Sequence, residues 1–170
     1  MVAQLQADYA NWWDGVKDQL NLPERIVIGD DAENPTLLTC CEWFDVIVDQ
    51  QRQVRAGDPR NGVWHVDIAT AGDYRFELRR WPRAADLPLQ AAAPAAEATD
   101  GLLPAGQALP IAAARIRIGE QTRETEISTD DPAAVFEISL PAEPCEIETA
   151  FLDGAGRELC GAYYLHVTRQ

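Results

Sequence analysis

The sequence is poor in positive charge and in histidine, and it has no long apolar run. Its 14 Lys and Arg residues stand against 28 Asp and Glu residues, so the net charge is −14 over 170 residues. Nucleic acids and anionic membranes both require a positive field on the protein, so we expect neither as a partner. No apolar stretch approaches the roughly 18 residues that predict a membrane span.

A secretion signal is also missing from the N-terminus. Residues 1–8 have neither a basic start nor an apolar stretch. As written, the chain is expected to stay in the cytoplasm, where it is made. If it is a fragment of a longer enzyme, a signal would precede residue 1 and the location would be periplasmic or exported.

The motifs of common catalytic sites are absent as well. The chain has two histidines, His65 and His166, and both fall in patterns typical of half-exposed strands. There is no H-E-x-x-H, G-x-G-x-x-G or G-x-S-x-G motif. The many acids leave a two-carboxylate mechanism open without any pattern that favours it. We therefore expect no enzymatic activity from this chain on its own.

The four cysteines lack the C-x-x-C spacing of zinc and redox sites. Cys40 and Cys41 are adjacent, whereas Cys145 and Cys160 flank a turn at 153–156 on the two strands of a predicted hairpin. The register of that hairpin sets Cys160 opposite residue 149, too far from Cys145 for a disulfide. We expect four buried thiols.

An amphipathic helix is predicted over residues 3–21, where Asn21 and Pro23 end it. Its apolar residues lie on one face: Leu5, Tyr9, Trp12, Trp13, Val16 and Leu20. Two adjacent tryptophans make this face more apolar than a free helix can carry. The helix must therefore dock, either on its own β domain or on another domain.

After Pro23 the apolar period changes to two, the period of half-buried strands. Residues 63–68 alternate around Trp64, and residues 74–79 alternate around Phe76. The turn at 71–73 between them predicts a hairpin. Further strands are expected at 25–28, 36–40, 43–48, 113–118, 124–127, 134–140, 145–152 and 159–168.

These strands predict a mainly β protein, an antiparallel β-sandwich preceded by one N-terminal amphipathic helix. The length suits a single domain over 1–170, with the helix in 1–22 and the sandwich in 23–170. A long Ala/Pro-rich loop at about 83–107 shows neither period, so we expect a mobile surface excursion there.

Positive charge is concentrated in one part of the chain. Residues 52–83 hold seven arginines against four acids. These arginines either form a solvated face with internal ion pairs, each worth about 0–1 kcal/mol, or a surface for an anion or an acidic partner.

One loop suggests a metal site. Asp30, Asp31, Glu33 and Asn34 cluster oxygen atoms between two predicted strands, and Ca²⁺ prefers such ligands. The loop fails the EF-hand pattern, because Ala32 occupies a ligand position. A tight turn whose Asp side chains accept backbone hydrogen bonds is the alternative that we favour.

Two segments carry a resemblance to a known family, Tyr74-Arg-Phe-Glu-Leu-Arg-Arg-Trp-Pro82 and Leu159-Cys-Gly-Ala-Tyr-Tyr164. With them, in the same order, come landmarks at 9–13, 28–36, 38–43, 61–66, 108–111 and 114–119. Together they resemble the C-terminal, non-catalytic β domain of bacterial arylsulfatase-like proteins over about nine tenths of the chain. The C/S-x-P-x-R motif of the formylglycine-type catalytic domain is absent.

The resemblance implies an accessory or interaction domain that packs on a sulfatase catalytic domain. The strand pattern from Trp64 to Trp81 and the final strand also look like the jelly-roll sandwich of galactose-binding-like modules. This leaves open a second function, a carbohydrate-binding module for glycans, sulfated ones included. Candidate ligand residues are Arg75, Arg79, Arg80, Trp81 and Arg83. Trp81 shares the strand parity of Arg75 and Arg79, so we expect it on the open face.

Overall fold

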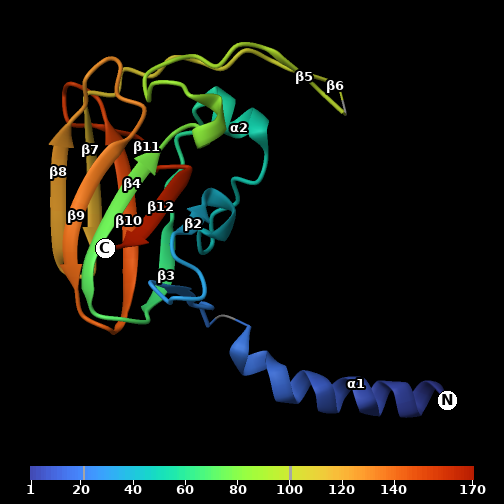
Figure 1. The fold of residues 1–170 in the computed structure, drawn as a ribbon. Coiled ribbons are helices and arrows are strands. Elements are labelled where there is room, and N and C mark those ends of the chain that lie inside the picture. The colour runs from blue at the N-terminus through green and yellow to red at the C-terminus, as the bar shows by residue number, and fades with distance from the viewer. Residues whose placement is uncertain (21, 100) are drawn as a thin grey trace.

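Alternating apolar residues line the inner faces of two packed sheets. The computed structural model describes residues 1–20, 22–99 and 101–170. The six-stranded sheet contains β1 (Ile26–Ile28), β3 (Val63–Ile68), β7 (Ala113–Ile118), β8 (Gln121–Glu126), β10 (Pro144–Leu152) and β11 (Glu158–Cys160). The four-stranded sheet contains β2 (Thr36–Thr39), β4 (Gly72–Arg79), β9 (Ala134–Leu140) and β12 (Tyr164–Arg169). Figure 1 shows the two layers. The predicted β-sandwich is confirmed, and all its pairings are antiparallel except that of β1 with β3.

The core lies between the sheets, as the period-two pattern predicts. Trp64 and Val66 of β3 are fully buried, and so are Tyr74, Phe76 and Leu78 of β4. The Trp64 indole donates a hydrogen bond to the Thr39 carbonyl at 2.8 Å, so its one polar atom is satisfied inside the core.

The predicted hairpin of residues 63–79 is wrong. β3 belongs to the six-stranded sheet, where it pairs with β1 and β10, whereas β4 pairs with β9 and β12 in the other sheet. The short turn between them carries the chain from one sheet to the other. Both strands have one apolar face, and these faces meet across the core instead of lying side by side.

No strand forms at 43–48, contrary to the sequence prediction. A short 3-10 helix, Cys40–Glu42, follows β2, because Thr39 and Glu42 form a capping box with the backbone at its start. Asp45 then adopts a left-handed conformation with φ 58°, which interrupts any extended segment. Phe44 alone pairs with Val63, and the missed helix α2 (Gln51–Ala56) comes next.

The Ala/Pro-rich segment differs from the expected loop. It contains a 3-10 helix (Arg83–Ala85) and the two-stranded hairpin of β5 (Ala96–Ala98) and β6 (Gly101–Leu103), which extends away from the sandwich (Figure 1). Its base is anchored, since Leu89 and Ile111 are buried. Arg55 of α2 donates hydrogen bonds to the carbonyls of Pro94 and Pro104, at 2.7 and 2.9 Å.

The N-terminal helix α1 (Val2–Val16) continues into a 3-10 turn, Lys17–Gln19. Position 21, where the sequence predicts the end of the helix, lies outside the described residues. The helix projects away from the sandwich in Figure 1. Within the part of the chain that the structure describes, no helix is long and apolar enough to cross a membrane.

Candidate functional site

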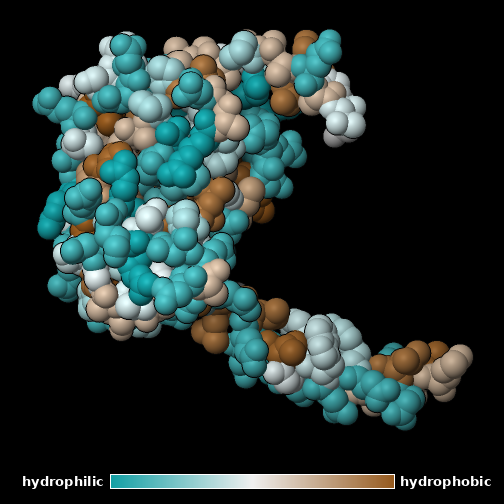
Figure 2. Space-filling model, in the orientation of Figure 1, coloured by the Kyte–Doolittle hydropathy of each residue, from teal (hydrophilic) through white to brown (hydrophobic). Residues whose placement is uncertain are grey.

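The apolar face of α1 is exposed, and we call Leu5, Tyr9, Trp12 and Trp13 its aromatic face. No residue of α1 is buried, and the side chains of Leu5, Tyr9 and Trp12 remain 57–63% exposed. Figure 2 shows brown apolar side chains along this helix, clear of the sandwich. The helix therefore does not dock on its own β domain, which was one of the two outcomes expected from the sequence.

The three rings of this face lie close together, with one pair stacked and the other two pairs tilted. The centroids of Tyr9 and Trp13 are 6.4 Å apart with nearly parallel planes, and Trp12 lies 5.8 Å from Tyr9 and 6.3 Å from Trp13. These distances are typical of aromatic pairs. The spacing i, i+3 and i+4 brings the rings together on one side of the helix, and this local packing presents them as one contiguous surface.

The arginines predicted to bind a ligand lie on or beyond β4, and several are already paired. Glu77 accepts hydrogen bonds from Arg79 and from Arg83, the latter at 2.9 Å. Burial by itself would raise the pKa of the Glu77 carboxyl, but the hydrogen bonds from Arg83 and Arg79 lower that pKa to about 2. Arg75 is more exposed than Arg79 and lies 3.9 Å from Glu137 of β9.

Trp81 is not on the open face, so the prediction of its exposure is wrong, and the candidate ligand residue Arg80 is buried as well. Arg80 is fully buried, and its guanidinium donates to the carbonyls of Ala91 and Gln107 at 3.2 and 2.6 Å. Trp81 is 2% exposed and also donates to Ala91. β4 ends at Arg79, so strand parity no longer applies at position 81. Both side chains anchor the Ala/Pro-rich segment.

The predicted metal loop connects β1 to β2, and Asp30, Asp31 and Asn34 each have a protein partner for a side-chain oxygen. The Asp30 carboxylate accepts a hydrogen bond from the backbone of Ala32 at 2.8 Å, as in an Asx turn. Asn34 exchanges two hydrogen bonds with the backbone of Arg169, whose guanidinium pairs with Asp31. Glu33 contributes its carbonyl to the hydroxyl of Thr36.

Among the described residues, no group of three or more His, Cys, Asp or Glu side chains is arranged to hold a metal ion. The loop geometry is that of the tight turn. Calcium binding here stays a prediction for experiment.

The cysteines are all free, and two depart from the expected burial, because Cys41 is exposed and Cys145 is half-buried. The thiols of Cys40 and Cys41 both point at the carbonyl of Val48, at 3.1 and 3.7 Å. Burial, together with the Cys41 thiol beside it, raises the pKa of the Cys40 thiol to about 12, so Cys40 is a poor nucleophile. Cys160 stands opposite Phe151, not residue 149, because a bulge shifts the register.

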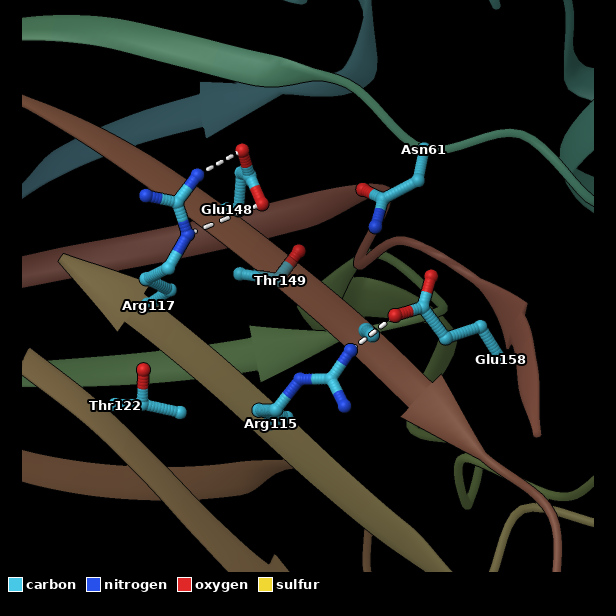
Figure 3. Close-up of a pocket in the computed structure, with 8 residues that line it drawn as sticks. Asn61, Arg115, Arg117, Thr122, Glu148, Thr149 and Glu158 are labelled. Atoms are coloured by element: carbon cyan, nitrogen blue, oxygen red, sulfur yellow. Dashed lines mark hydrogen bonds and ion pairs between the residues drawn. The ribbon is translucent and has the colours of Figure 1, made fainter. Parts of the chain in front are cut away.

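Sequence reasoning missed a polar pocket on the outer face of the six-stranded sheet (Figure 3). Its walls are two ion pairs, Arg115 with Glu158 and Arg117 with Glu148. The alternation in β7 does place both arginines outward. The sequence could not show that β10, β11 and Asn61 would meet them.

The comparisons with known proteins found a distant solved structure and no family. No family model matches the sequence, and no curated protein matches it. A solved structure described as a ruminal GH26 endo-beta-1,4-mannanase is similar, with a TM-score of 0.41 and 9% identity. The similarity covers 80% of this chain and 26% of that one, so the chain spans about a quarter of that structure.

Proposed function

We propose that the chain is a non-catalytic interaction module that docks on a sulfatase catalytic domain through the aromatic face of α1. One observation carries the proposal: α1 holds its apolar residues away from a sandwich whose own core is closed without them. Exposed aromatic clusters of this kind mark protein–protein contact sites. The resemblance to the C-terminal region of arylsulfatase-like proteins supplies the class of partner.

The energetics favour a partner for this helix. An isolated helix of about 12–15 residues is marginal in water, and α1 packs no buried residue against the sandwich, so a partner would supply most of the stability of this helix. Three aromatic side chains bury about 150–250 Å² each, and since about half of that area is still exposed, docking removes roughly 300 Å² from water. At about 25 cal/mol per Å² this contributes about 7 kcal/mol.

That gain is within the range of about 4–15 kcal/mol that free association costs. The aromatic face alone therefore suits a partner that is covalently linked or that makes additional contacts with the sandwich. An accessory domain held next to its catalytic domain meets this condition.

A binding titration tests the proposal. The partner is the catalytic domain of an arylsulfatase-like enzyme, expressed without its own C-terminal region, and binding is followed by calorimetry. We expect saturable binding that Trp12→Ala weakens about thirtyfold, since an aromatic anchor contributes about 2 kcal/mol. Ile47→Ala is the matched control, because Ile47 is an exposed apolar residue outside α1.

Binding that Trp12→Ala leaves unchanged would overturn the proposed interface. Concentration-dependent dimerisation of the chain through the same tryptophan would assign the face to a second copy instead. Light scattering of the purified chain separates these two outcomes.

The alternative, a carbohydrate-binding module, loses part of its predicted site. Arg80 and Trp81 are buried, and Arg79 and Arg83 are engaged by Glu77. Of the five residues proposed for sulfated glycans, Arg83 is the most exposed but pairs with Glu77, and Arg75 on the four-stranded sheet is half-buried beside Glu137. That face therefore offers a weak basis for sugar binding.

A further inference from the structure

The polar pocket on the outer face of the six-stranded sheet has the features of a ligand site. It encloses a cavity of about 260 Å³. Ala150 of β10 lies opposite Arg115 of β7 and presents only a methyl group at the floor, so the long side chains around it leave space. The cavity is smaller than the about 300–1,000 Å³ of drug-sized sites, which limits it to one small ring of a ligand.

The walls of the pocket are held in place by ion pairs. Arg117 donates to both carboxylate oxygens of Glu148, the second contact being from Nε at 3.3 Å. Arg115 donates through one terminal nitrogen to Glu158. Within the described residues no protein acceptor is found for the Nε and the other terminal nitrogen of Arg115. These pairs fix donors and acceptors side by side without leaving a net charge.

Asn61 adds a donor of defined direction. Its side-chain oxygen accepts a hydrogen bond from the backbone of Gly62 at 2.9 Å, which turns its amide nitrogen toward the pocket (Figure 3). The hydroxyl of Thr122 lies across the pocket on β8 (Figure 3). Neighbouring hydroxyls of a sugar each donate and accept hydrogen bonds, so alternating fixed donors and acceptors match them.

An aromatic ring stands on the same face of the sheet. Phe44 pairs with Val63, Val63 with Glu148, and Glu148 with Arg117, so these four residues form one row across the strands. Phe44 is 38% exposed and its ring packs against His65 at 5.2 Å. With strands about 4.8 Å apart, roughly 14 Å separates Phe44 from Arg117, so a ligand that touches both is an oligomer.

We propose that this pocket and the row leading to Phe44 bind a neutral oligosaccharide. An anionic ligand fits poorly, because both arginines are neutralised and Glu124 and Glu146 add negative charge on the same face. The site lies on the sandwich and uses no residue of α1. It is therefore independent of the proposed docking function, and either can fail without the other.

Nuclear magnetic resonance of the isotope-labelled chain tests the inference. The probes are cellohexaose, mannohexaose and xylohexaose, with a heparin-derived hexasaccharide as the anionic comparison. We expect saturable shifts of the Asn61 side-chain amide and the Arg115 Nε–H with at least one neutral probe. Arg115→Ala should weaken that binding about tenfold, since a hydrogen bond to a charged group is removed.

Arg75→Ala is the matched control, because Arg75 is also an ion-paired strand arginine but lies on the four-stranded sheet. Its affinity should equal that of the unchanged chain. Glu158→Gln keeps the shape of the pocket and provides a second variant, with a similar loss expected. The inference is overturned by three outcomes: no saturable shift with any neutral probe, tighter binding of the heparin fragment at these residues, or equal effects of Arg115→Ala and Arg75→Ala.

Discussion

The five tryptophans lie in two regions of the molecule, the sandwich and α1, and they differ in how much of each side chain is exposed. In the sandwich Trp43, Trp64 and Trp81 are at most 4% exposed, whereas in α1 Trp12 and Trp13 are 57% and 38% exposed. The sandwich is complete in itself, and its tryptophans stabilise the fold. The helix leaves its tryptophans in water, where they stabilise little and remain free for a partner. Stability and interaction are therefore carried by different residues of one type.

The largest expected effect tests whether the sandwich tryptophans stabilise the fold and the α1 tryptophans do not. Trp64→Ala should lower the free energy of unfolding by about 3–5 kcal/mol, because it leaves a cavity in the core and an unpaired carbonyl at Thr39. Trp12→Ala should change it by less than about 0.5 kcal/mol. Urea denaturation followed by circular dichroism measures both. Equal losses would show that α1 packs on the sandwich in solution.

A buried charge in the sandwich gives the next largest effect. The pKa of Glu77 is lowered in the folded chain to about 2 from an ordinary value of 4.5, and its side chain is 10% exposed. The stabilisation, about 3 kcal/mol, is fully present above about pH 4.5 and is lost as the pH falls toward 2. Glu77→Gln should remove this pH dependence and lower stability at pH 7 by about 2 kcal/mol. Denaturation at several pH values checks it.

Glu137→Gln is the control for that experiment. Glu137 is a 72% exposed carboxylate on the adjacent strand, and its pair with Arg75 spans 3.9 Å. Its loss should cost less than about 0.5 kcal/mol. A comparable loss of stability in both variants would contradict the claim that the buried Glu77 contributes more than an exposed, ion-paired carboxylate.

The smallest expected effect on stability concerns the loop for which the sequence suggested a calcium site. Asp30 accepts a hydrogen bond from Ala32, so Asp30→Ala should lower stability by about 1 kcal/mol whether or not Ca²⁺ is present. Thermal melts with and without CaCl₂ check this. A calcium-dependent rise in melting temperature that disappears in Asp30→Ala would instead establish the metal site.

The faces of individual strands could be predicted from the sequence, because alternation depends only on local geometry. Phe136, Ile138 and Leu140 point inward as their spacing indicates. Strand partners could not be predicted, since the pattern of β3 fits any neighbour with an apolar face. The left-handed Asp45 and the end of β4 at Arg79 are set by the surrounding structure, and they account for the errors at 43–48 and at Trp81.

The two candidate sites, the aromatic face of α1 and the polar pocket, also differ in how far the sequence could predict them. The aromatic face of α1 follows from helical spacing alone, so the sequence predicted it, but the sequence left open whether this face docks on the chain's own β domain or on another domain. The polar pocket depends on Asn61, β7, β10 and β11 meeting on one sheet, with contacts such as Arg115 to Glu158 that span 43 residues. No local pattern contains that information.

Hydrogen exchange along α1 tests the central claim most directly. The backbone amides of α1 are measured in the isolated chain and again with the sulfatase catalytic domain, with β10 as the internal reference. We expect fast exchange of α1 in the isolated chain and strong protection on addition of the partner, while β10 is protected in both states. Protection of α1 equal to that of β10 without any partner, or no change when the partner is added, would contradict the account.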